Sequence, residues 1–446
     1  MKCPNKKSDV INIADYPFSV LRFLQNVVFL YKNRAYNMQY NISPPDKIHQ
    51  AITLPPSKSI SNRLLILNAL SYSAETIENL SDCEDTQVII DAFASESNVF
   101  DVKGAGTAMR FLTAFLAAME GEWIIKGNAR MHERPIYPLV DTLIALGAEI
   151  KYLEKEGYPP LKINGKHLEG GEVYISGNMS SQFISALLMI APKMEKGLTI
   201  HLENEVISKP YIRLTLGLME EYGVKAKWEG QDISVKNQEY VPKKIRVEAD
   251  WSAASYWYSF AALLPESEIT LYGLQKKSLQ GDANLVNLFA DLGVTTDFIE
   301  NGIVIRKTRK TIKKFFHDFV NEPDLAQTFV VTCCLLNTTF MFSGVQTLKI
   351  KETDRIEALK TELQKLGYTI KSDDARIMEW DGERCFPAPG VAIASYNDHR
   401  MAMSFTPACI PLGSITIADP HVVSKSYPDF WADIKSAGFI IKEIED

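Results

Sequence analysis

The chain has 446 residues, of which 46% are hydrophobic, and a formal net charge of −7. A chain of this length exceeds the size at which a single hydrophobic core stops growing, so we expect two domains. The acidic balance excludes a protein that coats nucleic acid with a broad basic face, and any anionic partner must be held by a local basic cluster.

The N-terminal segment predicts neither a membrane span nor a targeting sequence. Residues 18–31 are apolar but interrupted by Arg22, Gln25 and Asn26, and the chain contains no run of about 18 apolar residues. The segment lacks the features of a signal or transit peptide. Residues 1–37 also fall outside the repeat described below. We interpret them as an N-terminal extension, with Met38 as the candidate beginning of the native protein.

The six cysteines form no C-x-x-C pair, and Cys333 and Cys334 lie in an apolar, helix-like run. This pattern argues against a disulfide framework or a zinc site. We expect reduced, buried thiols in a cytoplasmic protein.

Glycines that follow predicted helices recur at near-constant spacing. Each suits the left-handed position just past a helix, because glycine has no Cβ to clash. Recurrence every 70 to 76 residues indicates an internal repeat. These glycines are Gly147, Gly223, Gly293, Gly367 and Gly438.

A second helix is predicted to begin about 40 residues before each of these glycines. The predicted starts are Gly104, Ser180, Asp250, Asp324 and Asp398, and a further copy begins at Ser57. Ser and Asp are favoured at such positions because their side chains accept the first free backbone N–H groups. Six copies of helices alternating with strands predict an α/β protein with three copies in each domain. A doubly wound nucleotide-binding sheet is the alternative, but GAGTAM lacks the third glycine of that motif.

Basic and hydroxyl residues gather at these helix starts and in the short segments between copies. Free N–H groups and the helix dipole favour anions there, so the sequence predicts a site for a multiply anionic small molecule. Simpler interpretations stay open for several residues. Ser180 and Ser181 could only cap a helix, Lys351, Glu352 and Arg355 could be an exposed helical pair, and His399 could only pack.

Eight motifs, in order along the chain, resemble those of the 5-enolpyruvylshikimate-3-phosphate synthases, an enolpyruvyl transferase family. The resemblance runs from about residue 40 to the end. The motifs are PSKSISNR (56–63), GAGTAMR (104–110), RMHERPI (130–136), SSQF (180–183), ISKPY (207–211), KETDR (351–355), NDHRMAM (397–403) and SKSYPDF (424–430).

This resemblance implies two inverted α/β barrel domains of three repeats each, with the active site in the cleft between them. Residues 57–247 would form the first lobe, and 38–56 plus 248–446 the second. The implied reaction adds the 5-hydroxyl of shikimate-3-phosphate to phosphoenolpyruvate and then eliminates phosphate. It implies no metal or organic cofactor, no nucleic-acid or membrane partner, and a monomer.

Residue roles follow from the same resemblance. Asp324 matches the base near the 5-hydroxyl, Glu352 the residue that handles the methylene proton, and Lys58 a cation between both substrates. Phosphoenolpyruvate would be held by Lys58, Gly106, Thr107, Arg130, Gln182, Arg355, Arg400 and Lys425. Shikimate-3-phosphate would be held by Lys58, Ser59, Arg63, Ser180, Ser181, Gln182, Ser208, Tyr211, Asp324, Thr347 and Lys351.

The chain departs from the family pattern at Gly104, Phe111 and Thr347. Two rival functions remain. A sister transferase that acts on UDP-N-acetylglucosamine usually supplies a cysteine from the first lobe, where this chain has only Cys83, in a different motif. A non-catalytic anion-binding relative is disfavoured by the presence of both Asp324 and Glu352.

Overall fold

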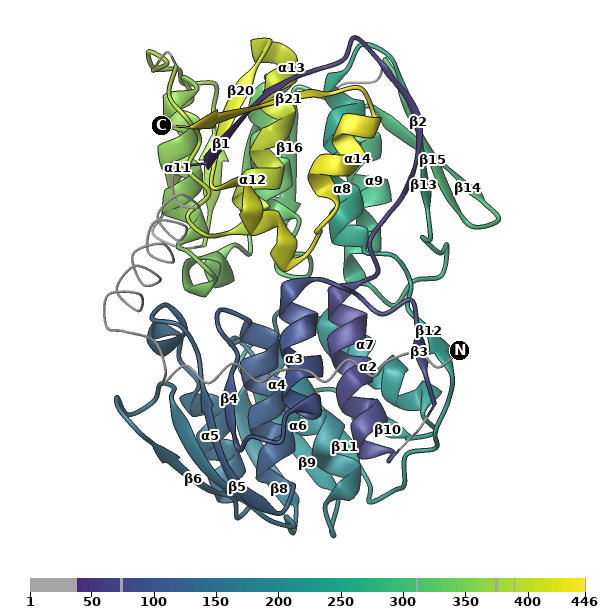
Figure 1. Ribbon diagram of the computed structural model, residues 1–446, viewed down its shortest axis with the longest axis vertical. Helices are drawn as coiled ribbons and strands as arrows, with labels where there is room; N and C mark the ends of the chain where they lie inside the picture. Colours follow the sequence, from purple (N-terminus) through teal and green to yellow (C-terminus); the bar gives the residue numbers. More distant parts are fainter. Residues whose placement is uncertain (1–37, 73–74, 310–311, 374–375, 389, 446) are drawn as a thin grey trace, which may run out of the picture.

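The computed structural model describes residues 38–72, 75–309, 312–373, 376–388 and 390–445. The segment interpreted as an extension, residues 1–37, lies outside the described residues. Two lobes stack along the long axis of the molecule (Figure 1). One hydrophobic core is drawn from residues 60–247, and a separate one from residues 40–54 together with 249–439. We call the corresponding parts the first and the second lobe.

The described chain forms six sheets, three in each lobe, and four of them have the same four-stranded pattern. In three of them the parallel pair consists of consecutive strands joined through a helix, and in the fourth Ile48–Thr53 pairs in parallel with Ser267–Tyr272 across the whole first lobe. In all four, a second helix leads to an antiparallel hairpin. The parallel pair needs the helical crossover, because a tight turn cannot join parallel strands. This topology confirms the predicted α/β class and the count of three repeats per lobe.

Within its described residues, the first lobe contains six α-helices and three sheets. Its sheets are β6-β7-β5-β4, β10-β11-β9-β8 and the pair β12-β3. The helices are α2 (Lys58–Leu70), α3 (Glu84–Ala94), α4 (Gly106–Ala117), α5 (Tyr137–Ala145), α6 (Ser181–Ile190) and α7 (Lys209–Glu221). The strands are β3 (Ile77–Glu78), β4 (Val99–Asp101), β5 (Gly121–Lys126), β6 (Glu149–Tyr152), β7 (Leu161–Gly165), β8 (Gly171–Ser176), β9 (Leu198–Glu203), β10 (Ala226–Glu229), β11 (Asp232–Val235) and β12 (Ile245–Arg246).

The second lobe joins the beginning of the described chain to its end. Its sheets are β14-β15-β13-β2, β16-β17-β19-β18 and β20-β1-β21. The helices are α8 (Trp251–Leu263), α9 (Leu285–Asp291), α10 (Ala326–Leu335), α11 (Arg355–Lys365), α12 (His399–Phe405), α13 (Cys409–Leu412) and α14 (Phe430–Ser436). The strands are β1 (Met38–Ser43), β2 (Ile48–Thr53), β13 (Ser267–Tyr272), β14 (Val294–Ile299), β15 (Gly302–Lys307), β16 (Lys314–Asp318), β17 (Thr339–Ser343), β18 (Lys371–Ser372), β19 (Met378–Trp380), β20 (Ile415–Ala418) and β21 (Ile440–Glu445).

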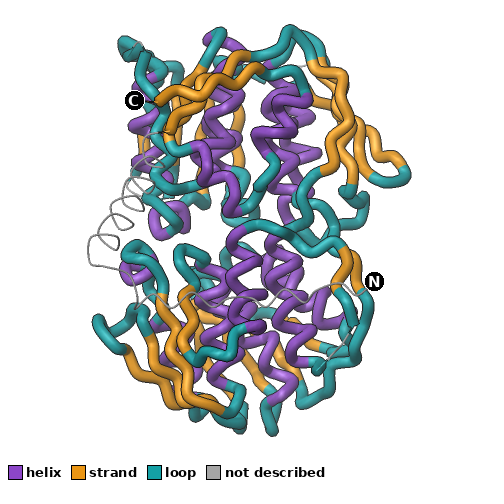
Figure 2. Tube along the Cα trace, in the orientation of Figure 1, coloured by secondary structure: helices purple, strands orange, loops and turns teal. Residues whose placement is uncertain are grey.

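The first helix of each repeat is buried on nearly all sides. Every residue of α10 is buried, as are all but one of α4. A helix that is apolar all round belongs in the interior. Figure 2 shows the strands largely along the outer sides of each lobe, with helices between them. The buried helices run lengthwise and bring their N-termini to the space between the lobes (Figure 1).

The helix ends agree closely with the sequence. Ser57, Ser180, Asp250 and Asp398 cap α2, α6, α8 and α12, each accepting a bond from a backbone N–H of the first turn. The five spaced glycines, from Gly147 to Gly438, all have positive φ, between 81° and 95°. The left-handed conformation explains the choice of glycine at these ends.

The chain passes between the lobes at two segments that lie side by side. The backbone N–H of Ser57 donates to the carbonyl of Glu248 at 2.8 Å, and that of Asp250 donates to the carbonyl of Pro55 at 2.8 Å. The Glu248 carboxylate accepts bonds from Trp251, Ser278 and Gln280 of the second lobe. The crossing is therefore a two-stranded connection anchored on the second lobe.

Candidate active site

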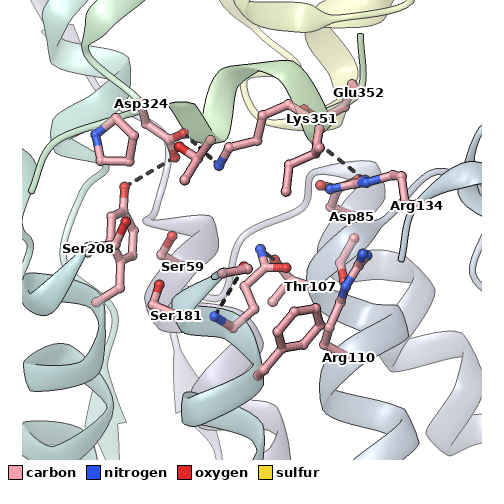
Figure 3. A pocket seen from close by; sticks show the side chains of 18 of the residues that line it. Ser59, Asp85, Thr107, Arg110, Arg134, Ser181, Ser208, Asp324, Lys351 and Glu352 are labelled. Atoms are coloured by element: carbon pink, nitrogen blue, oxygen red, sulfur yellow. Dashed lines mark hydrogen bonds and ion pairs between the residues drawn. The ribbon is translucent and has the colours of Figure 1, made fainter. Parts of the chain in front are cut away.

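A pocket lies between the lobes, where the helix N-termini meet. Its open mouth included, it measures about 1060 Å³. The first lobe supplies the starts of α2, α4, α6 and α7, and the second supplies the segments before α10 and α11 and the start of α12. Figure 3 shows Ser59, Thr107 and Ser181 on one side of the pocket, with Asp324, Lys351 and Glu352 opposite.

Most of the residues expected from the sequence line this one pocket. They are Lys58, Ser59, Arg63, Gly106, Thr107, Ser180, Ser181, Gln182, Ser208, Tyr211, Asp324, Thr347, Lys351, Glu352, Arg355 and Arg400. Two do not, namely Arg130 and Lys425. These two line a smaller neighbouring cavity that shares Arg134 and Glu352 with the main pocket.

Lys58, at the first position of α2, forms a buried ion pair with Asp85. The two side chains lie 2.9 Å apart and are 14% and 12% exposed. Burial lowers the pKa of Lys58, but the nearby acidic groups, Asp85 first and then Cys83 and Glu352, together outweigh burial and raise it. Lys58 therefore stays protonated. Sequence reasoning missed Asp85 in this role, because its motif context predicted only a helix.

Arg63 is held in place by hydrogen bonds within the first lobe. Its Nε donates to the Thr215 hydroxyl at 2.7 Å, and one terminal nitrogen donates to the carbonyl of Ser59 at 2.9 Å. Its guanidinium also lies over the ring of Phe111, 5.2 Å from the centroid. Burial lowers the pKa of Arg63 to about 10, so the group is still charged at neutral pH. Phe111, one of the positions where the chain departs from the family pattern, thus packs against a basic residue of the site.

Arg134 of RMHERPI lines the pocket itself, whereas the expected Arg130 lines the neighbouring cavity and donates one bond to the carbonyl of Lys351 at 3.3 Å. The Arg134 side chain is 7% exposed and lies 3.9 Å from Glu352. The Arg130 side chain is 39% exposed and pairs with Glu133 at 3.0 Å. A Cβ on Gly106 would come within 2.8 Å of both terminal nitrogens of Arg134. Glycine at the start of α4 is therefore what allows this guanidinium to approach.

Asp324 is not the helix cap that its position before α10 suggested. The cap position is occupied by Leu325, and the Asp324 carboxylate makes no capping bond. It lies instead 2.9 Å from Arg400, and 3.5 Å from both Lys351 and Arg355. Burial would raise its pKa, but Arg400, Lys351 and Arg355 outweigh that effect and hold the pKa well below its usual range. Asp324 is thus an ionised carboxylate facing the pocket.

Glu352 and Arg355 belong to a buried charge network and not to an exposed helical pair. Helix α11 begins at Arg355, so Glu352 precedes the helix. Arg355 is 1% exposed and bonds to Asp398 at 2.7 Å and Glu352 at 2.8 Å. Burial would raise the pKa of Glu352, but Arg355 and Arg134 hold it well below normal.

His399 faces this network as a neutral ring. It is 2% exposed, and burial, followed by Lys58 and Arg400, lowers its pKa well below the usual value. Neither ring nitrogen has a hydrogen-bond partner in the described part of the chain. If His399 only packs, as the sequence alone allows, its two buried ring nitrogens are left without a hydrogen bond.

Several other pocket residues carry buried polar atoms without a partner among the described residues. They are the Nε atoms of Arg110, Arg134 and Arg400, one terminal nitrogen of Arg355 and the hydroxyl of Thr347. Buried polar groups in proteins are normally hydrogen-bonded, so this set indicates a missing polar ligand. Most of these atoms are donors, which favours an anion. Within the described residues, no group of three or more His, Cys, Asp or Glu is placed to hold a metal ion.

Comparisons with known proteins point to one family. The sequence matches the family described as EPSP synthase (3-phosphoshikimate 1-carboxyvinyltransferase) over residues 42–95 and 90–434. A 3-phosphoshikimate 1-carboxyvinyltransferase of Bacteroides fragilis is 52% identical over 410 residues, covering 92% of this chain and all of the relative. One of Aliivibrio salmonicida is 36% identical over 424 residues, covering 88% and 98%.

A solved structure has the same fold. The EPSP synthase from Acinetobacter baumannii superposes with a TM-score of 0.74 at 22% identity, covering 92% of this chain and 100% of that one. At this identity the likeness shows the fold alone, and it confirms the predicted two-domain α/β architecture.

Proposed function

The chain belongs to the EPSP synthase family, and from this premise we propose how its pocket carries out the reaction. The enzyme transfers the enolpyruvyl group of phosphoenolpyruvate to the 5-hydroxyl of shikimate-3-phosphate and releases phosphate, a step of the shikimate pathway to chorismate and the aromatic amino acids. The two substrates carry two phosphates and two carboxylates. The observation that carries the assignment is a pocket lined by seven Lys and Arg side chains in a chain of net charge −7: Lys58, Arg63, Arg110, Arg134, Lys351, Arg355 and Arg400.

We assign shikimate-3-phosphate to the side of the pocket formed by α2, α6 and α7. Hydroxyl groups and helix N-termini there favour a phosphate, and the rigid guanidinium of Arg63 suits the carboxylate. The binding set consists of Lys58, Ser59, Arg63, Ser180, Ser181, Gln182, Ser208, Tyr211, Asp324, Thr347 and Lys351.

Phosphoenolpyruvate is assigned to the side where α4 meets α11 and α12. Arg134, admitted by Gly106, replaces Arg130 in the proposed phosphate site. Arg400 and Arg355 each keep a nitrogen without a hydrogen-bond partner among the described residues, that of Arg355 lying 3.5 Å from Asp324, and such donors suit a carboxylate. The binding set consists of Lys58, Gly106, Thr107, Arg134, Gln182, Arg355 and Arg400, with Arg130 and Lys425 at its edge.

The acid and base roles follow from which groups carry a proton at rest. Asp324 and Glu352 are both ionised, since neighbouring cations hold their pKa values low. Lys58 alone of the three is protonated. We therefore assign Asp324 as the base that takes the 5-hydroxyl proton and Lys58 as the resting acid. Glu352 then acts on the methylene carbon only after a proton reaches it from a ligand or from Lys58.

A phosphate-release assay with both substrates tests the function. Purified protein is expected to release phosphate only when both phosphoenolpyruvate and shikimate-3-phosphate are present. Release with UDP-N-acetylglucosamine in place of shikimate-3-phosphate would establish the sister activity instead. The structure disfavours that outcome, because Cys83 of the first lobe is fully buried against Thr86.

The domain boundaries, oligomeric state and compartment are also proposals. We place residues 57–247 in one domain and 38–56 with 248–446 in the other, which follows the two separate cores.

A monomer is supported because one chain supplies both walls of the pocket. A cytoplasmic location is supported by the five described cysteines, which are all free. No helix in the described ranges is long and apolar enough to cross a membrane. Sedimentation of the purified enzyme tests the oligomeric state.

A further inference from the structure

Asp282 is a buried carboxyl behind the wall of the pocket. It lies in a short 3₁₀ helix (Gly281–Asn284) just before α9, is 4% exposed, and does not line the pocket. The hydroxyl of Ser252, in the first turn of α8, donates to one of its oxygens. Within the described residues it forms no ion pair. A buried carboxyl without a cation needs another reason for its place in the fold.

The hydroxyl of Tyr211 connects Asp282 to the pocket. Its oxygen lies 3.1 Å from Oδ2 of Asp324 and 3.5 Å from Oδ1 of Asp282. Tyr211 comes from α7 of the first lobe and both carboxyls come from the second, so the contact forms where the lobes meet. A phenol has one proton to donate and here faces two carboxyl groups. The carboxyl that does not accept the hydrogen bond from Tyr211 is favoured to carry a proton of its own.

The surroundings of the two carboxyls decide which one holds the proton. Asp324 lies within ion-pair distance of Arg400, Lys351 and Arg355. Burial, followed by the charge of Asp324, raises the pKa of Asp282 to about 7. The charged and titratable groups that face Asp282 are Asp324, Arg400, Asp250 and Tyr211. A proton that enters this chain is therefore stable on Asp282 and unstable on Asp324.

We propose that Asp282 is a positioning residue for the transfer reaction, which takes up through Tyr211 the proton that Asp324 removes from the substrate hydroxyl. The inference rests on the proposed role of Asp324. As the substrate oxygen bonds to C2 of phosphoenolpyruvate, its O–H bond breaks and the proton passes to Asp324. Asp324 gives that proton to the Tyr211 oxygen while the Tyr211 proton moves to Asp282. Tyr211 is unchanged, Asp324 is again a carboxylate, and Asp282 is neutral.

The stored proton returns when the intermediate breaks down. The bond from C2 to the phosphate oxygen breaks, C3 gives a proton back to the acid that protonated it, and the same two transfers in reverse carry the stored proton through Asp324 to the departing phosphate. This division of work solves a chemical problem. A base with a pKa far below the working pH is a poor final acceptor, whereas a group that titrates near that pH is a good one. Asp324 makes the contact with substrate, and Asp282 holds the proton.

The first test is the variant Asp282→Asn, which keeps the shape and can still bond to Ser252 and Tyr211 but cannot accept a proton. Wild-type kcat is expected to fall as the pH drops through about 7, because protonated Asp282 can take no further proton. Asp282→Asn should lower kcat by about ten- to a hundredfold, part of the range typical of acid–base groups. It should also remove the acidic limb of the profile and leave both KM values within about threefold.

Ser252→Ala is the matched control, because it keeps the carboxyl and removes one bond that stabilises the ionised form. The loss of that bond should raise the pKa of Asp282 and shift the acidic limb of kcat to higher pH. At high pH, kcat should recover to within about threefold of wild type. A merely structural role would not move the limb, so this variant keeps the test valid if Asp282→Asn fails to fold.

Two outcomes overturn the proposal. One is an Asp282→Asn enzyme with wild-type kcat and an unchanged acidic limb, and the other is a Ser252→Ala enzyme whose limb does not move. Both variants are measured after the wild-type enzyme has been shown to release phosphate. Failure of the proposed function would appear earlier, as a wild-type protein with no phosphate release.

Discussion

The two walls of the pocket handle charge in different ways. The wall of the first lobe presents hydroxyl groups at helix N-termini and four cations, with Asp85 as its single carboxylate. The wall of the second lobe presents a closed network in which Asp324, Glu352 and Asp398 are already bonded to Arg355 and Arg400. One wall is therefore prepared for anions that are absent, whereas the other has its charges balanced before any ligand arrives.

This difference indicates which wall binds and which one moves protons. Preorganised donors without partners gain bonds when a phosphate enters, so they contribute to affinity. A balanced network instead fixes the protonation state of each member and changes little in charge on binding. We therefore expect changes to the hydroxyl groups and arginines of the first lobe to appear mainly in KM, and changes to Asp324 and Glu352 mainly in kcat.

The largest effect is expected for Asp324→Asn. The variant keeps the size of the side chain and removes the proton acceptor, so kcat should fall by about 10² to 10⁴, the usual contribution of a positioned acid–base group. Affinity for shikimate-3-phosphate should change little, since the lost charge serves the transition state. Steady-state kinetics and equilibrium binding measure the two quantities. Near wild-type turnover would move the base elsewhere, with Glu352 next in line.

The next largest effect should distinguish the two arginines of RMHERPI. Arg134→Lys removes the planar fork that faces the pocket, and bonds to charged groups contribute about 1.5–3 kcal/mol, roughly a tenfold to hundredfold change. We expect KM for phosphoenolpyruvate to rise by about that factor. Arg130→Lys, at the edge of the binding set, keeps a cation near Glu133 and the Lys351 carbonyl and should stay within about threefold. Equal effects of both variants would contradict the placement of Arg134 in the phosphate site.

A smaller effect should separate capping from binding at the start of α6. Ser180 accepts the bond from the N–H of Gln182, whereas no described residue bonds to the Ser181 hydroxyl. Ser180→Ala should lower the free energy of unfolding by about 0.5–2 kcal/mol, the usual value of an N-cap. Ser181→Ala should leave it within about 0.5 kcal/mol and raise KM for shikimate-3-phosphate about three- to tenfold. Urea unfolding and steady-state kinetics of both variants test this assignment. A loss of stability in Ser181→Ala with a raised KM only in Ser180→Ala would refute it.

The smallest effect is expected for a contact between the lobes outside the pocket. The Ser424 hydroxyl donates to Glu84 of α3 at 2.5 Å in an exposed position. Exposed polar contacts contribute at most about 1 kcal/mol. Ser424→Ala should therefore change kcat and both KM values by less than about fivefold. A larger loss would mean that this contact contributes to the pocket as much as the charge network does.

The repeat and its helix ends could be predicted from the sequence, because they depend on local chemistry. Glycines with positive φ and the caps at Ser180 and Asp398 are set by the residue itself and its nearest backbone. The motif resemblance also brought together most of the pocket. Arg130 and Arg134, however, occur in one short motif, and only the 3₁₀ turn (Met131–Glu133) decides which of them faces inward.

The rest depended on contacts between distant segments. Asp324 stands at a predicted helix start, but Arg400 and Lys351 draw its carboxylate away from the backbone. Asp85 and Asp282 carry no signal in their own motifs. Their roles appear only when Lys58 and Tyr211 reach them across the fold. The sequence pattern of a single helix or strand gives no information about contacts between distant side chains.

Strand β1 lies between β20 and β21, so the sheet at the edge of the second lobe joins residues 38–43 to residues 415–418 and 440–445. This has a consequence for synthesis on the ribosome. The first lobe is continuous and can fold as soon as residue 247 has emerged, but β1 then waits for roughly 200 further residues. At about 5–20 residues per second, that wait lasts roughly 10–40 s. During this time β1 is an unpaired strand, and we expect this N-terminal strand to be the part of the nascent chain that most needs a chaperone.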